Sequence, residues 1–269
     1  MIKSNFHTHT VFCDGADTPE ELVTEAINKG FIALGFSGHS YFEQDKEYCM
    51  DEQSAREYRR TVNALKDKYK KDIHILCGIE QDYYSETPVF IYDYVIGSVH
   101  NVLKDGKYLS VDASPEIFRA NLVTYYGGDF DAFAEDYFAV VADVVNKTNA
   151  DIIGHFDLIL RFSEKLGYTP TPRFLAAAEK AVDALVKFDR PFEINTGAMA
   201  RGSRSIPYPI PEILKMIKEK GGKIVFSSDC HAKAHLDCAF TVAEKLAKDC
   251  GFTEHGILTG EGIEYIPIL

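Results

Sequence analysis

The chain has 269 residues, of which 46% are hydrophobic, and carries a formal net charge of −12 at pH 7. This composition is typical of a globular protein with a sizeable core, and the acidic balance argues against binding to long nucleic acids, which it would repel. No apolar run approaches the roughly 20 residues that span a bilayer, and the N-terminal residues lack a signal-peptide pattern. We therefore predict no membrane partner, and nothing in the composition implies a protein partner.

The six cysteines form no Cys-x-x-Cys pair. A chain of this length does not need disulfide bonds to hold a core together, so reduced thiols are the simplest interpretation. Together with the missing secretion signal, this predicts a cytoplasmic protein.

Short apolar segments typical of β-strands alternate with longer amphipathic segments typical of helices. The expected strands are residues 5–8, 32–37, 73–79, 94–99, 151–155, 192–195, 223–227 and 263–268. Helix starts are expected where Thr or Ser precedes Pro, at 18–19, 114–115 and 171–172. Residues 101–150 are less regular, and we expect an insertion around 104–108 followed by helices between 114 and 147.

Strands that alternate with helices predict a parallel α/β sheet. The pattern alone leaves open whether this sheet closes into a barrel or remains open and doubly wound. No linker, low-complexity tract or short repeat divides the chain, so residues 1–269 are predicted to form a single domain.

Ionisable side chains gather at the C-terminal ends of the expected strands. Six of the nine histidines lie there, together with three acids: His7, His9, His39, His100, His155, His231, Asp14, Glu80 and Asp229. In a parallel α/β architecture these strand ends share one face, so residues far apart in the sequence can meet. We expect the other three histidines to lie elsewhere, His74 in mid-strand and His235 and His255 in helices or loops.

The spacing within these groups favours shared ligands. Side chains at positions i and i+2 of a strand point to the same side, so His7 and His9 can bind one ion together, as can Asp229 and His231. A single histidine at a strand end is more often a hydrogen-bonded structural residue. A set of nine buried imidazoles and carboxylates is hard to explain in that way, because buried charges are costly unless they are paired or bound to metal.

Imidazole and carboxylate ligands without thiolate suit zinc, iron or manganese. Nine candidates exceed the needs of one ion, so two or three divalent ions are predicted. Three such ions would outweigh the three carboxylates and leave the site positive, which would attract a phosphate. Phosphate monoesters hydrolyse extremely slowly without help, and metal ions supply the Lewis-acid catalysis that this reaction needs.

The chain resembles the polymerase and histidinol phosphatase (PHP) family, and especially its histidinol-phosphatase branch. The matching segments occur in family order across almost the whole chain, at residues 6–10 with 14–15, 35–39, 78–80, 97–100, 153–157 and 226–231. The resemblance implies a distorted seven-stranded (β/α) barrel, similar to a TIM barrel, with three metal ions at the C-terminal ends of the strands.

By analogy with the family, each ion has its own set of ligands. One ion would be bound by His7, His9, Glu80 and Asp229, a second by Glu80, His100 and His155, and a third by Asp14, His39 and His231. A hydroxide bridging two ions would attack phosphorus, and Asp229 or a neighbouring group would protonate the leaving alkoxide. We therefore place Asp229, Glu80 and His231 in the catalytic set.

The family pattern also places arginines near the phosphate. Arg161 is the first candidate, and Arg201 or Arg204 is a second, although the sequence leaves the register of the second arginine open. For Arg201 and Arg204 a role as ordinary surface charges is about as well supported.

The resemblance implies a phosphomonoesterase that acts on a small phosphate ester, L-histidinol phosphate, in histidine biosynthesis. One alternative is a related phosphoesterase acting on nucleotides or oligonucleotide ends. Another is an amidohydrolase-type barrel, which also begins with His-x-His but commonly bridges two metals with a modified lysine, whereas Glu80 stands at the corresponding strand end here. A metal-binding module without enzymatic activity is the fourth possibility.

Overall fold

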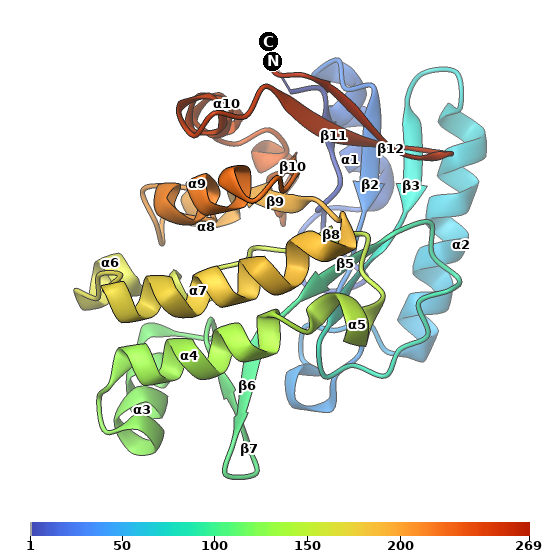
Figure 1. The fold of residues 1–269 in the computed structure, drawn as a ribbon. Helices are drawn as coiled ribbons and strands as arrows, with labels where there is room; N and C mark the ends of the chain where they lie inside the picture. The colour runs from blue at the N-terminus through green and yellow to red at the C-terminus, as the bar shows by residue number, and fades with distance from the viewer. Residues whose placement is uncertain (1) are drawn as a thin grey trace.

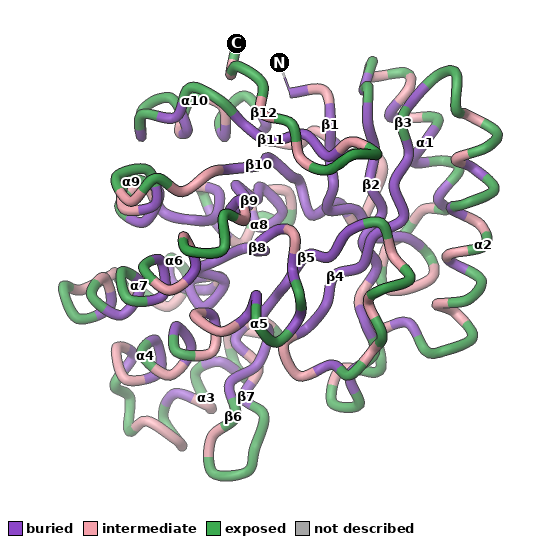
Figure 2. Tube along the Cα trace, turned by 45° about the vertical axis from the view of Figure 1, so that its right-hand side comes forward, coloured by how far each residue is buried: buried purple, intermediate pink, exposed green. Residues whose placement is uncertain are grey.

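The computed structural model describes residues 2–269 and has an α/β fold in which helices surround a group of mainly parallel strands (Figure 1). The helices are α1 (Pro19–Asn28), α2 (Glu52–Tyr69), α3 (Pro115–Tyr126), α4 (Phe130–Val141), α5 (Val144–Thr148), α6 (Ser163–Leu166), α7 (Pro172–Leu185), α8 (Gly197–Ala200), α9 (Pro211–Glu219) and α10 (Phe240–Asp249). Helices α4, α7 and α9 pack side by side on one side of the strands, and α2 lies on the other. In Figure 2 most strands of the centre are buried, whereas β12 and the outward faces of these helices are exposed.

Most of the strands belong to two sheets. A three-stranded sheet has the order β1-β2-β3, from β1 (Ser4–Asn5), β2 (Ala33–Phe36) and β3 (His74–Cys77). A seven-stranded sheet has the order β12-β11-β10-β9-β8-β5-β4, from β4 (Ile79–Asp82), β5 (Val95–Ser98), β8 (Ile152–Ile153), β9 (Phe192–Asn195), β10 (Ile224–Ser227), β11 (Glu254–Thr259) and β12 (Gly262–Pro267). The six strands from β11 to β4 pair in parallel. Only β12 pairs antiparallel, with β11, so the larger sheet is mixed.

The two sheets meet where one expected strand divides. Residues 73–79 are split at Gly78, so that β3 pairs with β2 and β4 pairs with β5. A Cβ atom on Gly78 would lie 2.3 Å from Cζ of Tyr94, so only glycine fits there. The buried Tyr94 hydroxyl donates to the carbonyl oxygens of Phe6 (2.5 Å) and Phe36 (3.0 Å), and it thereby ties the ends of β1 and β2 to β5.

The sheet hydrogen bonds do not by themselves close the seven-stranded barrel expected from the resemblance. Two isolated parallel bridges connect the sheets: Thr8 pairs with Cys230 beyond β1 and β10, and His39 pairs with Glu80 beyond β2. Both bridges lie toward the C-terminal ends of the strands. These ends are therefore drawn together even though the ladders of the two sheets are separate.

Two hairpins depart from the expected helix–strand alternation. The insertion expected around residues 104–108 is the antiparallel hairpin of β6 (Asn101–Lys104) and β7 (Lys107–Ser110). The last expected strand, β12, has an unexpected antiparallel partner, β11, which contains His255. The expectation that His255 lies in a helix or loop is therefore wrong, because β11 buries its ring beside Phe226.

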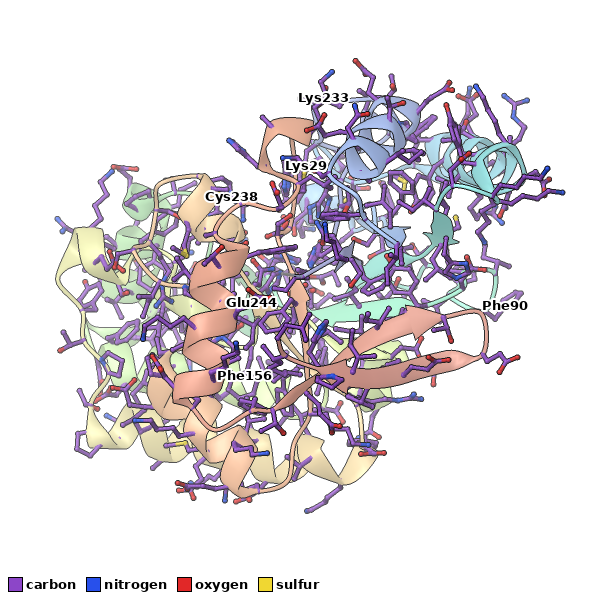
Figure 3. The ribbon with its side chains drawn as sticks, turned by 90° about the horizontal axis from the view of Figure 1, so that it is seen from above. Lys29, Phe90, Phe156, Lys233, Cys238 and Glu244 are labelled. Atoms are coloured by element: carbon purple, nitrogen blue, oxygen red, sulfur yellow. The ribbon has the colours of Figure 1, made fainter. Side chains whose placement is uncertain are left out.

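The predicted helix starts are confirmed. Thr18 caps α1 through a complete capping box with Glu21, and Ser114 and Thr171 cap α3 and α7 ahead of their prolines. Large aromatic side chains fill the space between helices and strands. Figure 3 shows Phe156 in the interior, fully buried, and Phe90 at the periphery, with 86% of its surface exposed.

Within residues 2–269 no helix has both the length and the apolar character needed to cross a membrane. The six cysteines are all free thiols in the structure.

Candidate metal centre

The structure brings all nine candidate ligands together at the C-terminal ends of the strands. His7 and His9 follow β1, His39 follows β2, His100 follows β5, His155 follows β8, and Asp229 and His231 follow β10, while Glu80 lies within β4 and Asp14 on the loop beyond β1. Neighbouring imidazole rings lie 4.1–5.8 Å apart between centroids, as in the pairs His9–His231 and His7–His155. Residues more than 220 positions apart in the sequence therefore share one site.

Glu80 is the centre of this group. Its carboxylate is buried, and its two oxygens face different imidazoles. Oε1 lies 2.9 Å from His155 Nε2 and 3.4 Å from His100 Nε2. Oε2 lies 3.0 Å from His39 Nδ1, 3.2 Å from His7 Nε2 and 3.5 Å from His9 Nε2. A carboxylate with one ligand set at each oxygen has the arrangement needed to bridge two cations.

Three overlapping groups have ligand atoms within 4.8 Å of one another and so could each hold a metal ion: His7, His9 and Asp229; His39, Glu80 and His100; and His9, Asp14, His39 and His231. These groups overlap the three sets implied by the family but differ in membership. Glu80 is not in the first group, His39 takes the place of His155 in the second, and His9 joins the third. His39 lies between two of them, because its Nδ1 faces Glu80 while its Nε2 is 3.7 Å from Asp14 Oδ1.

The chemistry of these side chains fits divalent cations. His7 Nε2, His9 Nε2 and Glu80 Oε2 are buried and have no hydrogen-bond partner among residues 2–269. Buried polar atoms without partners are costly, and these three point toward one another. Nitrogen and oxygen donors that converge in this way suit zinc, iron or manganese.

The electrostatic balance keeps the carboxylates ionised. Burial by itself raises the pKa of Glu80, but the imidazoles of His7, His39 and His100 hold it well below its ordinary value. Burial is likewise outweighed at Asp229, where the Arg201 guanidinium and His7 hold the pKa of the carboxyl well below its usual range. Burial lowers the pKa of His9 to about 3, with help from His231 and His39, so that ring is neutral and its nitrogens can bind a cation.

Asp229 has a backbone conformation that few residues adopt. Its φ of 47° lies in the left-handed region, where aspartate is tolerated better than bulkier residues. The turn directs Oδ1 toward His9 Nε2, at 3.3 Å, and Oδ2 toward Arg201, at 2.8 Å. Strained backbone of this kind is commonly retained at functional sites.

A cavity of about 210 Å³ opens onto the centre. All the candidate ligands except His7 and His9 line it, and so do Arg161 and Arg201. Arg201 donates to Asp229 and Arg161 donates to Asp112, at 3.0 Å. Arg204 is not among the lining residues: its guanidinium is buried and stacks on the ring of Tyr208. The structure thus brings two of the three predicted arginines to the cavity.

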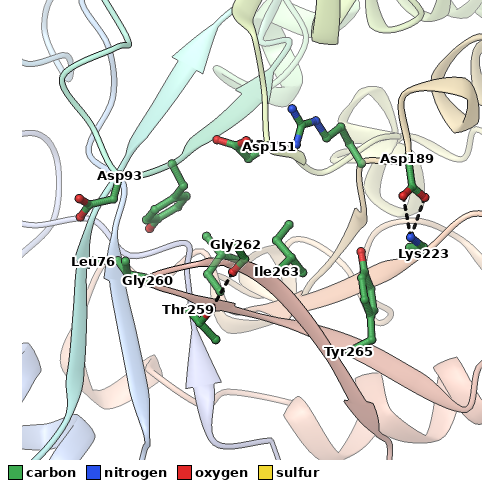
Figure 4. A pocket seen from close by; sticks show the side chains of 13 residues that line it. Leu76, Asp93, Asp151, Asp189, Lys223, Thr259, Gly260, Gly262, Ile263 and Tyr265 are labelled. Atoms are coloured by element: carbon green, nitrogen blue, oxygen red, sulfur yellow. Dashed lines mark hydrogen bonds and ion pairs between the residues drawn. The ribbon is translucent and has the colours of Figure 1, made fainter.

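A larger cavity of about 400 Å³ lies at the opposite ends of the strands (Figure 4). Residues that precede β5, β8, β9 and β10 line it, and the tip of the β11–β12 hairpin covers it. Four of the charged side chains that line it pair with each other: Asp189 with Lys223, at 2.7 Å, and Asp151 with Arg190, at 3.3 Å. This cavity holds none of the candidate ligands, so size alone does not mark the functional site.

Residues 5–197 match the family model of the PHP domain. The chain belongs to the PHP family. Among curated proteins it is similar to the "Probable histidinol-phosphatase" of Schizosaccharomyces pombe, with 27% identity over 94% of this chain and 87% of the relative. It is also similar to the "Histidinol-phosphatase" of Bacillus subtilis, with 24% identity over 89% of this chain and 97% of the relative.

Solved structures share the PHP fold of this chain. A putative histidinol phosphatase from Listeria monocytogenes superposes with a TM-score of 0.80 at 23% identity, covering 89% of this chain and 99% of that one. A histidinol phosphate phosphatase from Lactococcus lactis, solved with zinc, L-histidinol and phosphate, superposes with a TM-score of 0.72 at 23% identity, covering 97% of this chain and 98% of that one.

Sequence reasoning missed four residues of this PHP site. Asp82 Oδ2 lies 3.1 Å from His100 Nδ1, and Glu193 Oε1 lies 2.6 Å from His7 Nδ1. The strand alternation could have revealed Asp82, which is two residues from Glu80 on β4, but β9 carries no candidate ligand from which Glu193 could have been counted. Tyr48 and Asp112 line the cavity from irregular segments, where no periodic pattern indicates which way a side chain points.

Proposed function

We propose that this chain is a metal-dependent phosphomonoesterase that hydrolyses L-histidinol phosphate to L-histidinol and phosphate. The observation that carries the proposal is the convergence of nine imidazole and carboxylate ligands around Glu80 beside two arginines, in a cavity of about 210 Å³. The curated relatives named as histidinol phosphatases support the choice of substrate. A cavity of this size suits a small phosphate ester better than a polymer.

We also propose that the two sheets act as one distorted seven-stranded barrel made by β1, β2, the β3–β4 segment, β5, β8, β9 and β10, within a single domain. The parallel bridges Thr8–Cys230 and His39–Glu80 support this arrangement. The nine candidate ligands would hold two or three divalent ions at the mouth of the barrel. When bound, these ions would polarise the phosphoryl group and acidify a water molecule.

The side chains of the cavity have defined tasks in this reaction. Arg161 and Arg201 donate hydrogen bonds to the phosphate oxygens, and their carboxylate partners Asp112 and Asp229 hold the guanidinium groups in place beforehand. Asp229 is ionised, so its Oδ1 can accept the proton released by the attacking water and return it to the leaving alkoxide. The cleaved bond is the P–O bond to the alcohol, which leaves as L-histidinol.

The lining of the cavity argues against an amidohydrolase. Such barrels commonly bridge their metals with a modified lysine, and among the described residues that line this cavity there is no lysine. Glu80 occupies the bridging position instead.

Phosphate release tests the proposal. The protein would be stripped of metal, reloaded separately with zinc, manganese or ferrous iron, and assayed with histidinol phosphate, p-nitrophenyl phosphate and nucleoside monophosphates. We expect kcat/KM for histidinol phosphate to exceed that for the other esters by at least about tenfold, which corresponds to about 1.4 kcal/mol of transition-state binding. Equal turnover of all the esters would overturn the substrate assignment, and amide hydrolysis without phosphate release would overturn the reaction class.

A further inference from the structure

Strand β9 contributes none of the nine candidate ligands, yet its Glu193 is fully buried directly beneath them. We propose that Glu193 is a positioning residue that orients two of the metal ligands, His7 and His155, from outside the ligand set. The inference rests on the metal centre of the proposed function. It goes beyond that function by assigning a role to a residue that binds neither metal nor substrate.

The contacts of Glu193 involve four elements of the fold. Oε1 accepts hydrogen bonds from His7 Nδ1, at 2.6 Å, and from the hydroxyl of Ser227 on β10. Oε2 accepts hydrogen bonds from the backbone N–H of His155, at 2.8 Å, and from the side-chain amide of Asn195, at 2.9 Å. All five residues are buried, so these bonds are shielded from competing water.

The bond to His7 determines which ring nitrogen can bind a cation. A carboxylate only accepts hydrogen bonds, so Nδ1 of His7 must carry the proton. In the neutral ring Nε2 is then unprotonated and presents its lone pair to the centre, where it lies 3.2 Å from Glu80 Oε2. The same bond fixes the rotation of the ring.

The bond to His155 acts through the backbone. By holding the N–H of His155, Glu193 fixes the start of the loop after β8, and the ring of that residue then reaches Glu80 Oε1 at 2.9 Å. His7 and His155 face different oxygens of Glu80. One buried carboxylate therefore positions ligands on both sides of the proposed bridge, which an apolar side chain of the same size could not do.

Metal affinity separates this role from a purely structural one. Glu193→Gln keeps the size of the side chain, but an NH₂ group replaces one carboxylate oxygen, and the donors at that position then have no acceptor. We expect the dissociation constant for zinc, measured by competition with a chromogenic chelator, to rise by about 10- to 100-fold, as for other carboxylates that hydrogen-bond a metal-binding histidine. Glu193→Asp keeps the charge but withdraws it from His7, and it should weaken zinc binding as well. If Glu193→Gln does not fold, Glu193→Asp decides the question.

The matched control is Asp151→Asn. Asp151 also accepts a hydrogen bond from a strand N–H, that of Val95 at 3.0 Å, but at the opposite ends of the strands. This control should bind zinc like the wild type, and the metal-free variants should keep the wild-type circular dichroism spectrum. Zinc affinity within twofold of the wild type in the Glu193 variants, or an equal loss in Asp151→Asn, would overturn the proposal. The assay involves no phosphate ester, so its outcome is independent of whether the substrate assignment holds.

Discussion

Replacing Glu80 with glutamine should remove the bridge between the two halves of the metal centre. In the native side chain Oε1 faces His100 and His155, and Oε2 faces His7 and His39. Glutamine keeps one oxygen and places an NH₂ group at the other position. Only one half can then retain a ligand atom from residue 80, and neither half retains the negative charge.

The expected loss of metal affinity follows from the binding free energy that one ligand contributes. Binding of zinc by four protein ligands contributes about 10–16 kcal/mol, or about 2.5–4 kcal/mol for each ligand. Losing one ligand therefore weakens binding by about 100- to 1000-fold. We expect Glu80→Gln to lose at least one ion that the wild-type chain retains, and to lose phosphatase activity with it.

Elemental analysis after dialysis against a metal buffer, with phosphate release measured on the same samples, tests this expectation. The control is Glu86→Gln, because Glu86 is an exposed residue whose carboxylate pairs with Lys147, at 2.8 Å, away from the centre. Unchanged metal content and turnover in Glu80→Gln would refute the bridging arrangement.

Three further predictions follow. Arg201→Met should lower kcat/KM by about 10- to 150-fold, which corresponds to one charge-assisted hydrogen bond of about 1.5–3 kcal/mol, and unchanged steady-state kinetics would contradict this. Burial by itself lowers the pKa values of the His7, His39 and His100 imidazoles, but nearby carboxylates outweigh it and raise these pKa values above 6.5. The metal-free chain should therefore lose stability as pH rises through these pKa values, and zinc binding should release protons and tighten over the same range, as calorimetry in two buffers would detect. A pH-independent affinity would contradict it. Gly78→Ala forces a Cβ against Tyr94 and should lower the free energy of unfolding, measured in urea, by about 1–3 kcal/mol. The control Gly260→Ala places its Cβ in open space and should leave the free energy of unfolding unchanged. Equal effects of the two substitutions would contradict the steric argument.

Periodicity made the strand positions predictable. Seven of the eight expected strands each correspond to one observed strand, and the histidines and acids at the strand ends converge as expected. This succeeds because a buried parallel strand requires a run of apolar residues, and the polar residue that follows marks where the strand leaves the core. The segment at residues 73–79 was misjudged because its division at Gly78 depends on the ring of Tyr94, which a local pattern cannot show.

The antiparallel partner of β12, strand β11, could not be predicted from the local sequence pattern either. Residues 254–259 contain His255 and Gly256, which weaken the strand signal, and their pairing with 262–267 depends on the neighbouring edge of β10. The register of the phosphate arginines was undetermined for a similar reason. Arg201 and Arg204 lie three residues apart in one loop, and only packing decides that one faces the cavity while the other stacks on Tyr208.

By itself, the sequence identified the side chains that are proposed to bind the metal ions of this PHP protein, because the order and spacing of His7, His9, Glu80 and Asp229 are properties of the chain. Only the tertiary structure decided how those groups are held. Glu193 orients His7 across 186 residues of sequence, and Arg201 reaches Asp229 across 28. Such contacts depend on distances between strands that are not neighbours along the chain, and no local pattern encodes those distances.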